Sequence, residues 1–389
     1  MRSYKHLFSR ALAASPGRLH FAAHSHHLWP DASYEGHVAA WNDAATLADR
    51  KWEKIYDDVI PAAQANIARE LNLPDPHTIT FGSNTHELIV RLFSARNSRP
   101  PLDVLTSDGE FHAFRRQAAR WEEQGMVRRR IVPCEPFETF TDRFLAAAVE
   151  KSPDIAFISQ VMFKSGLRFD GMQALAQFAS PDGAWVVIDG YHGFMAIPTD
   201  LNDIAERVFY VGGGYKYAMA GEGAGYMHAP PGYGLRPSNT GWFAEFAQME
   251  AKPVGVPYST DAMRFMGATY DVTGLYRFNA VRAMLDAEEL DTAAIYAHVD
   301  PLREKLVDTI ASRKAGALSD AELLRPNAEG PQARFISLRH PKATAWKAQL
   351  FEHNVITDAR DDVLRIGLGL YHDPEDVDAL VRVLAKLPH

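Results

Sequence analysis

Two kinds of hydrophobic spacing alternate along the first half of the chain. Short segments that predict strands occupy residues 78–81, 104–106, 127–132, 155–161, 185–188 and 208–211, and those at 155–161 and 185–188 are nearly all apolar. Segments with apolar residues every three or four positions, which predict helices, lie at residues 41–71, 88–93, 111–123 and 140–149. Strands that are apolar on both faces are typical of parallel sheets covered by helices, so the pattern predicts an α/β fold.

The pattern changes after residue 211. Glycines crowd around Lys216, at positions 212, 213, 214, 221, 223 and 225. A helical segment follows at residues 274–290, and a β-α-β-α pattern occupies residues 334–338, 343–351, 363–366 and 374–387, with a loop at residues 326–331. We therefore expect an N-terminal arm at residues 1–39, a large domain at residues 40–280 with a mostly parallel sheet, and a smaller C-terminal α/β domain at residues 281–389.

The composition is that of a globular protein with more than one domain. The 389 residues exceed what a single hydrophobic core usually serves, and 47% of them are hydrophobic. The net charge of -8 disfavours a nucleic-acid partner, which requires clustered Lys and Arg. No apolar run is long enough to span a bilayer, so we expect no membrane partner. The single cysteine, Cys134, excludes an intrachain disulfide and a zinc ribbon.

The N-terminal segment bears on the location of the protein. Residues 1–30 include basic residues and no acidic ones, which is also typical of a mitochondrial presequence. The segment is short and low in serine, so we interpret it as a short helix packed on the body of the protein. We therefore expect a cytoplasmic protein.

The glycine-rich segment fits none of three familiar motifs. Residues 221–225 do not complete the G-x-G-x-x-G of a dinucleotide site, and a strand-like pair follows them. The chain has no Gly-Lys pair, which a P-loop requires. His86 and Glu87 are not followed by the second histidine of a zinc-protease helix. The remaining candidate is Lys216 itself.

Lys216 and Asp189 each follow an apolar strand, at the edge where parallel sheets bind ligands. A lysine in an apolar, aromatic setting can have a lowered pKa and form a Schiff base with a carbonyl. An aspartate that faces a pyridine nitrogen keeps this nitrogen protonated. Pyridoxal phosphate needs both groups. From the spacing alone, a solvated lysine and an aspartate that caps a turn explain the pair equally well.

The residues around this pair resemble a known family. The chain reads Val-Ile-Asp-Gly-Tyr-His-Gly around Asp189, and Tyr215 and Lys216 lie together among the glycines. These motifs resemble the fold-type-I pyridoxal phosphate enzymes, which have the aspartate aminotransferase-like fold. Within this group the chain looks most like the class V aminotransferases, and especially the kynureninases. Further similar segments lie at residues 82–87, 241–242, 267–269, 356–358 and 364–371.

The resemblance implies a role for each matching residue. Lys216 would form the Schiff base with pyridoxal 5'-phosphate and later move protons, Asp189 would pair with the pyridine nitrogen, and His192 would lie near the phenolic oxygen. The other implied cofactor contacts are Phe111 stacked on the ring, Asn84, Thr85 and Tyr215 at the phosphate, and Trp242 and Thr269 at the cofactor of the neighbouring subunit, in a homodimer with shared active sites. Arg365 would bind the α-carboxylate of a small amino-acid substrate.

Without the resemblance, these residues have simpler interpretations. Phe111 would be a core residue, Asn84 and Thr85 would cap a helix, and Arg365 would form a surface ion pair.

Several reactions remain open. Kynureninase-like hydrolysis of a side-chain carbon–carbon bond is favoured, with Tyr215 as the proton donor at Cβ, whereas an aminotransferase needs only Lys216. A cysteine desulfurase or selenocysteine lyase is less expected, because these enzymes generally use a thiol in the C-terminal domain and Cys134 lies early in the large domain. A non-catalytic pyridoxal-binding module is least expected, because Lys216 and Arg365 are both present.

Two positions depart from the kynureninases. Phe114 stands where they have an aspartate, and the segment from His24 to His27, which reads His-Ser-His-His, stands where they have Asn-Ser-Leu-Gly. We expect His26 or His27 to face the substrate. The alternative is that the segment from His24 to His27 forms a simple turn without a role in binding. We expect no metal site, because no carboxylate or thiol is interleaved with the histidines.

Overall fold

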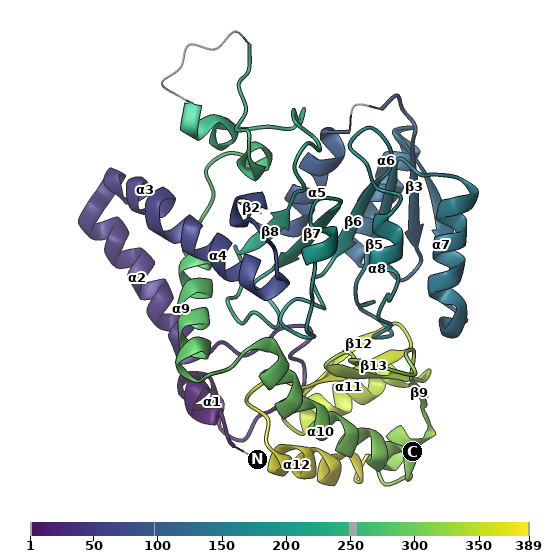
Figure 1. Cartoon of the computed structure of the whole chain (residues 1–389). Coiled ribbons are helices and arrows are strands. Elements are labelled where there is room, and N and C mark those ends of the chain that lie inside the picture. Colours follow the sequence, from purple (N-terminus) through teal and green to yellow (C-terminus); the bar gives the residue numbers. More distant parts are fainter. Residues whose placement is uncertain (1, 97, 249–254, 388–389) are drawn as a thin grey trace.

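The computed structural model describes residues 2–96, 98–248 and 255–387. The ends of the expected arm and small domain, residues 1 and 388–389, lie outside these ranges, as do residues 97 and 249–254 of the expected large domain. In the described part of the chain, a large α/β unit stands next to a smaller unit that is built from the C-terminal strands and helices (Figure 1). The predicted fold class is confirmed.

The sheet of the large unit has seven strands in the part of the chain that the structure describes. In spatial order they are β2 (Ile79–Gly82), β8 (Gly225–His228), β7 (Val208–Gly213), β6 (Trp185–Asp189), β5 (Ile155–Ser159), β3 (Leu102–Ser107) and β4 (Val127–Val132). Strand β8 runs antiparallel to both of its neighbours, and the other neighbouring pairs are parallel. Each of the six strands predicted for this half of the chain is present in this sheet.

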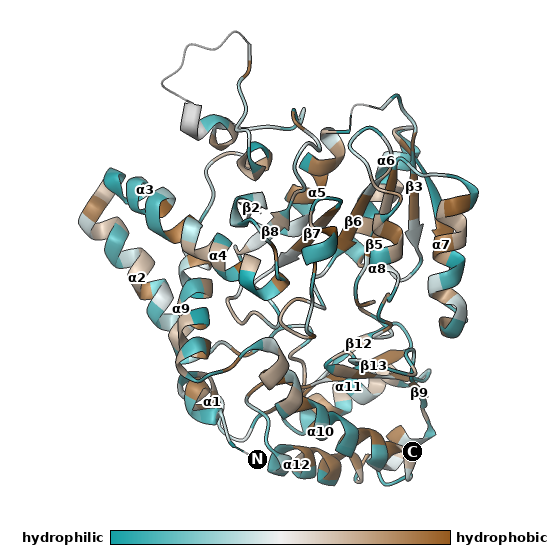
Figure 2. Ribbon diagram, viewed as in Figure 1, coloured by the Kyte–Doolittle hydropathy of each residue, from teal (hydrophilic) through white to brown (hydrophobic). Residues whose placement is uncertain are grey.

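Helices cover both faces of this sheet. On one face, α5 (Thr85–Ser94) and α6 (His112–Glu123) bury apolar residues such as Leu92 and Trp121. The second core takes its helical residues from α4 (Ile60–Leu71), α7 (Phe140–Glu150), α8 (Met172–Ala176) and α9 (Thr273–Ala287). Most of the central strands are coloured as hydrophobic in Figure 2, as expected for a sheet whose side chains are buried on both faces.

The smaller unit contains an antiparallel sheet with the order β12 (Asp358–Arg360), β13 (Val363–Gly367), β10 (Phe335–Arg339) and β9 (Glu322–Leu324). Its helices are α10 (Thr292–Ala311), α11 (Ala343–Glu352) and α12 (Pro374–Leu384). The predicted β-α-β-α pattern corresponds to β10, α11, β13 and α12. Helix α10 was not predicted, and it carries Pro301 in its interior, a residue type that usually ends a helix.

The N-terminal segment packs along the smaller unit. Phe8 is buried next to α1 (Ser9–Ala13), so the expected short helix is present. Strand β1 (Leu19–His20) pairs in parallel with β11 (Val355–Ile356), and the backbone N–H of Gly367 donates to the carbonyl of Phe21 at 2.7 Å. These bonds fix the chain beside β13 before α2 (Asp31–Leu47) begins.

One predicted helix is broken in the structure. Residues 41–71 belong to the end of α2, to α3 (Lys51–Lys54), to a π-helical turn at Ile55–Val59 and to α4. Ala48 has a φ of 51°, a left-handed conformation that ends α2. Trp41 is 69% exposed, so it does not contribute to a buried stripe. The expected boundary between residues 39 and 40 falls within α2.

None of the helices in the described residues combines the length and the apolarity that a membrane crossing requires.

Candidate active site

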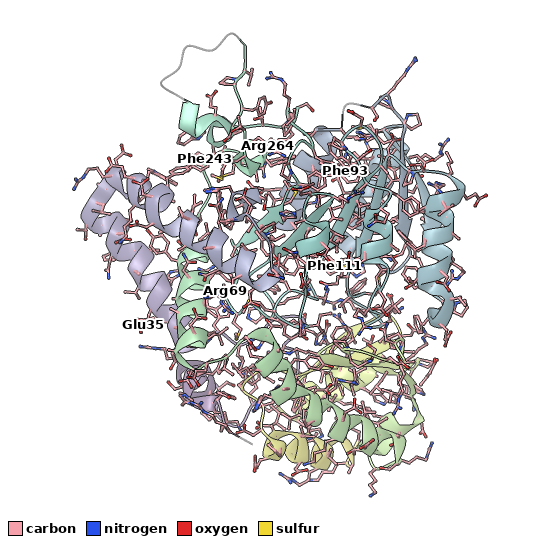
Figure 3. The ribbon with its side chains drawn as sticks, in the orientation of Figure 1. Glu35, Arg69, Phe93, Phe111, Phe243 and Arg264 are labelled. Atoms are coloured by element: carbon pink, nitrogen blue, oxygen red, sulfur yellow. The ribbon has the colours of Figure 1, made fainter. Side chains whose placement is uncertain are left out.

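A pocket of about 400 Å³ lies at the edge where the parallel strands end. Eight of the predicted site residues line it: Asn84, Thr85, Phe111, Asp189, His192, Tyr215, Lys216 and Arg365. Phe111 is labelled in Figure 3 at the edge of the large sheet that faces the smaller unit. The fold therefore brings residues from both units to one place, as the strand-end positions of Asp189 and Lys216 predict.

Lys216 is a buried amine. Its Nζ lies 2.6 Å from Nε2 of His192 and 5.3 Å from the centre of the Phe111 ring. Burial lowers the pKa of Lys216 to about 7; the charge of Asp189 acts in the opposite direction, and that of Arg365 lowers the pKa further. Burial also holds the pKa of His192 well below its usual value, so its ring is neutral. Near pH 7 a large fraction of Lys216 is therefore the neutral, nucleophilic amine.

The loop that follows Lys216 is held by contacts from distant segments. The guanidinium of Arg277 donates to the carbonyl of Ala220 at 2.6 Å and also to the carbonyl of Glu222. Gly221 has a φ of 70°, and a Cβ at this position would lie 2.3 Å from the Trp29 ring. A glycine is therefore required where the loop passes this ring.

Asp189 keeps one carboxylate oxygen available. Its Oδ1 accepts a hydrogen bond from the backbone N–H of Tyr191 at 2.9 Å, and no described residue donates to its Oδ2. Burial raises the pKa of Asp189, while the Tyr191 N–H and the charge of Lys216 act in the opposite direction. A protonated ring nitrogen at Oδ2 would compensate for this burial.

Glu110 is a second buried carboxyl group near Asp189, and sequence reasoning missed it. Ser107 and Ser159 donate from their hydroxyl groups to Glu110 at 2.6 and 2.5 Å, and Ser159 is the register partner of Asp189. Burial raises the pKa of Glu110 to about 8, and the charge of Asp189 raises it further. No local motif marks this residue, because its environment arises from the pairing of three strands.

The first turn of α5 can receive an anion. Asn84 caps the helix, because its side-chain oxygen accepts from the backbone N–H of Glu87 at 3.0 Å. A Cβ at Gly225 would lie 2.8 Å from the backbone of Asn84, so a glycine lets β8 pass close to this turn. Backbone N–H groups at a helix N-terminus favour a phosphate. Thr85 stands at this turn and lines the pocket.

These features together fit pyridoxal phosphate. The pocket has a neutral lysine, a buried carboxylate with an available oxygen, a helix N-terminus, and the ring of Phe111, which is 37% exposed. Each group matches one part of the cofactor: the carbonyl, the pyridine nitrogen, the phosphate and the ring face.

Arg365 is buried and already has partners. Its guanidinium donates to the carboxylate of Asp358 and, at 2.5 Å, to the carbonyl of Phe163. Arg360 donates to the other oxygen of Asp358 at 2.6 Å and also lines the pocket. Two arginines therefore share one carboxylate, and an anionic ligand would balance the remaining charge. The surface ion pair considered from the sequence is not what the structure shows, because Arg365 is only 2% exposed.

Four predicted site residues do not line this pocket. Trp242 donates from Nε1 to the hydroxyl of Thr269 at 3.1 Å, so these two residues lie together elsewhere. His26 is exposed, with its ring 5.2 Å from that of Tyr215. His27 is fully buried among aromatic rings in the core, a position that does not support the predicted substrate contact.

The neighbouring His24 and Ser25 line the pocket instead. The sequence marks their segment as a departure from the kynureninases, but spacing does not reveal which of its side chains point inward.

Cys134 lies outside the pocket lining. Burial raises the pKa of its thiol, as does the charge of Asp108, so the thiol stays protonated and unreactive. In the described part of the chain, no group of three or more His, Cys, Asp or Glu side chains is placed to hold a metal ion.

Comparisons with known proteins place the chain among relatives of similar sequence. The family model described as aminotransferase class-V matches residues 43–380. An isopenicillin N epimerase of Streptomyces clavuligerus is 26% identical over 350 residues, which cover 84% of this chain and 83% of that protein. A kynureninase of Deinococcus radiodurans is 30% identical over 246 residues, which cover 60% of this chain and 56% of that protein.

A solved structure has the same fold. The structure of a C-DES mutant with glycine covalently linked to its PLP cofactor superposes with a TM-score of 0.80 at 16% identity and covers 100% of both chains.

Proposed function

The chain belongs to the class V aminotransferase family and is a pyridoxal phosphate-dependent enzyme, and from this premise we propose that it hydrolyses a side-chain carbon–carbon bond of an amino acid, as kynureninases do. The predicted family and cofactor are confirmed, and the predicted reaction remains a proposal. One observation carries it: Tyr215 lines the pocket directly beside Lys216, where a proton donor for the leaving carbon is needed.

Four groups would hold the cofactor. Lys216 would bind it through Nζ, Asp189 would accept a hydrogen bond from the ring nitrogen, Phe111 would cover one ring face, and the first turn of α5 with Thr85 would hold the phosphate. When bound, pyridoxal phosphate supplies an electron sink that stabilises negative charge at the substrate's α carbon.

The protein supplies the proton transfers. Near pH 7 the neutral amine of Lys216 can accept the proton from the α carbon, and the neutral ring of His192 can accept a hydrogen bond from that amine. Burial raises the pKa of Tyr215, as does the charge of Glu222, so its phenol keeps its proton and can donate it to Cβ. Arg365 and Arg360 would orient the substrate carboxylate.

A second candidate is transamination, which one observation favours. The ring of Phe114 is buried against Phe157, with their centres 3.5 Å apart and their planes at 7°. This apolar wall stands where the kynureninases have an aspartate. Transamination needs only the transfer of a proton between the α carbon and the cofactor, which Lys216 can perform alone.

The proposed enzyme is a homodimer with shared sites. Its support is the pair formed by Trp242, which is 39% exposed, and Thr269, which lie outside the pocket of their own chain. Sedimentation velocity should give a dimer, and Trp242→Ala should weaken cofactor binding. A monomer with full cofactor affinity would contradict this part of the proposal.

One experiment separates the reactions. The holoenzyme is incubated with kynurenine, 3-hydroxykynurenine, cysteine and a panel of amino acids, and the products are identified by mass spectrometry. We expect alanine together with anthranilate or its hydroxy derivative. A keto acid from the substrate would favour transamination, alanine with sulfane sulfur, which an added thiol releases as sulfide, would favour desulfuration, and the opposite enantiomer would favour epimerisation. Each of these three outcomes contradicts carbon–carbon hydrolysis.

A further inference from the structure

His24 is a fully buried histidine that lines the candidate active site. Neither of its ring nitrogens has a hydrogen-bond partner among the described residues. Burial and the charges of Arg365, Lys216 and Arg360 hold the pKa of His24 well below its usual value, so the ring is neutral and carries one N–H donor. A buried donor without a partner is costly, and its presence beside a pocket indicates a ligand that completes it.

The ring is fixed in place by its neighbours. It stacks on Phe335, with ring centres 4.9 Å apart and planes at 28°. A Cβ at Gly367 would lie 2.1 Å from Nδ1 of His24, so the ring fills the space that this glycine leaves. The backbone bond from Gly367 to Phe21 and the bridge between Gly367 and Ala22 hold the segment of His24 against β13. The position of His24 is therefore set by the strand that also carries Arg365.

The second nitrogen faces the carboxylate that Arg365 binds. Nε2 of His24 lies 3.8 Å from Oδ2 of Asp358, which is the oxygen that Arg365 binds. This separation is too long for a hydrogen bond. An oxygen of a ligand that is held by Arg365 would be within reach of Nε2.

We propose that His24 is a substrate-binding residue, which donates a hydrogen bond from its imidazole to the carboxylate that Arg365 holds. The proposal rests on the assignment of Arg365 to the substrate carboxylate under the proposed function. The shape of the site alone does not require a histidine here, since a phenylalanine would also stack on Phe335 and would leave no unpaired polar atom. What a histidine adds at this position is its two ring nitrogens, with which a ligand can form a hydrogen bond.

The test isolates the contribution of the ligand's carboxylate to binding. Holoenzyme is titrated with L-alanine and with ethylamine, which lacks the carboxylate, and binding is followed by the shift of the cofactor's absorption band. The ratio of the two dissociation constants reports the carboxylate contacts. In His24→Phe we expect the affinity for L-alanine to fall about tenfold, the usual loss for one hydrogen bond to a charged group, and that for ethylamine to change less than about twofold. His24→Asn, which restores a donor, should recover part of the loss.

His86→Phe is the matched control, because His86 is exposed and lines the same pocket from α5. This variant should leave the ratio of the two dissociation constants unchanged. An unchanged ratio in His24→Phe, or an equal loss of affinity for both ligands, would overturn the proposal, since the second outcome indicates a structural role.

A measurement on the unaltered holoenzyme covers the case in which His24→Phe does not fold. With ¹⁵N-labelled histidine, the His24 signal, assigned by its absence in His24→Asn, should move on saturation with L-alanine and not with ethylamine. An unmoved signal would overturn the proposal.

The outcomes also separate this proposal from the proposed reaction. Suppose that the ratio of the dissociation constants for L-alanine and ethylamine depends on His24 in an enzyme that does not cleave a carbon–carbon bond. This result would refute only the proposed reaction. If Arg365→Lys leaves the affinity for L-alanine unchanged, the assignment of Arg365 itself is wrong.

Discussion

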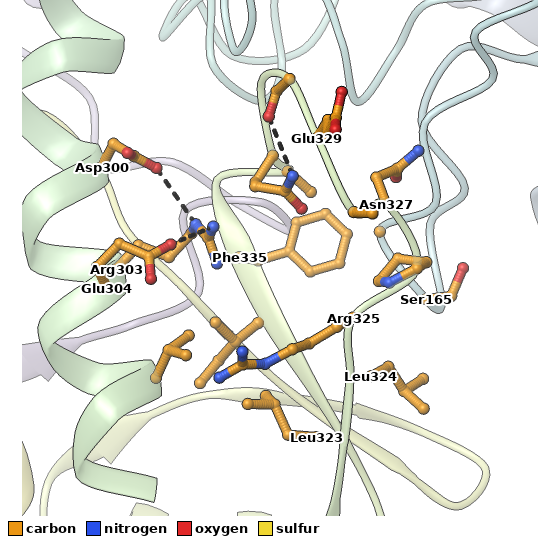
Figure 4. A pocket seen from close by; sticks show the side chains of 18 of the residues that line it. Ser165, Asp300, Arg303, Glu304, Leu323, Leu324, Arg325, Asn327, Glu329 and Phe335 are labelled. Atoms are coloured by element: carbon orange, nitrogen blue, oxygen red, sulfur yellow. Dashed lines mark hydrogen bonds and ion pairs between the residues drawn. The ribbon is translucent and has the colours of Figure 1, made fainter. Parts of the chain in front are cut away.

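Two cavities where the two units meet differ in how their charged groups are paired. The larger one, of about 620 Å³, lies between the loop at residues 326–331, α10 and the turn at Ser165 (Figure 4). The least exposed of its charged side chains is paired: Arg303 donates to Asp300 at 3.4 Å and to Glu304 at 2.6 Å. The smaller cavity, of about 400 Å³, contains Lys216 and His24, which are buried and have pKa values far from the usual ones.

The difference shows that size does not identify the active site. Charged groups near solvent pair with one another and need no ligand, whereas buried ionisable groups without full pairing persist where a ligand completes them. Phe335 separates the two environments, because it lines the larger cavity (Figure 4) and also stacks on His24 of the smaller one. The comparison can be tested by altering one charged group at a time in each cavity.

The largest effect is expected for Lys216→Ala. Removal of the amine takes away both the covalent attachment of the cofactor and the proton acceptor, so turnover should fall on the order of 10³-fold or more. Borohydride should fix the cofactor covalently to the unaltered protein and not to the variant, as detected by mass spectrometry. Full activity in this variant, or an unaltered protein that stays colourless after addition of cofactor, would refute the site.

A smaller loss is expected for Asp189→Asn. The substitution keeps the shape and removes the charge that would hold the ring nitrogen protonated, so kcat should fall on the order of 10²-fold. The cofactor should still bind through Lys216, which the absorption band would report. Unchanged kcat would mean that Asp189 does not face the ring.

Glu110→Gln should change how stability depends on pH. The pKa of Glu110 is raised to about 8 in the folded state, so the folded protein keeps a proton there that the unfolded chain releases above its ordinary pKa. Stability contributed by this group is therefore present at low pH and is lost as the pH rises toward 8.

The variant should consequently gain stability relative to the unaltered apoprotein between pH 5 and pH 8, on the order of 1–3 kcal/mol. Denaturant unfolding at several pH values measures this difference. Lys216 and the histidines titrate in both proteins, so their contributions to the pH dependence of stability cancel when the two proteins are compared. A difference that does not change with pH would show that Glu110 is ionised in the folded protein.

The smallest effect is expected for Arg303→Ala in the larger cavity. The carboxylates that pair with Arg303 are partly exposed to solvent, and such ion pairs contribute about 0–1 kcal/mol, so the free energy of unfolding should change little and kcat by less than about twofold. Steady-state kinetics of this variant next to Lys216→Ala tests the comparison directly. A large loss of activity would show that the larger cavity takes part in the reaction.

Local patterns predicted much of the large unit. The strands that became β5 and β6 were recognisable because nearly every residue of a strand inside a covered parallel sheet is apolar, and such a run needs no knowledge of its neighbours. Helix α10 and the break at Ala48 were missed for the opposite reason. Tertiary contacts override local spacing where a helix contains Pro301 or where the chain must reverse.

The sequence by itself determined the cofactor. Asp189 and Lys216 follow adjacent parallel strands, so their side chains must meet at one edge of the sheet, and the surrounding motifs name the cofactor. Only the tertiary structure decided which charges are paired and which are exposed to a ligand. Arg365 binds Asp358, Glu110 lies near Asp189, and His24 rather than His27 reaches the pocket. These outcomes depend on contacts between segments that are far apart in the chain, and burial then sets the pKa of each group.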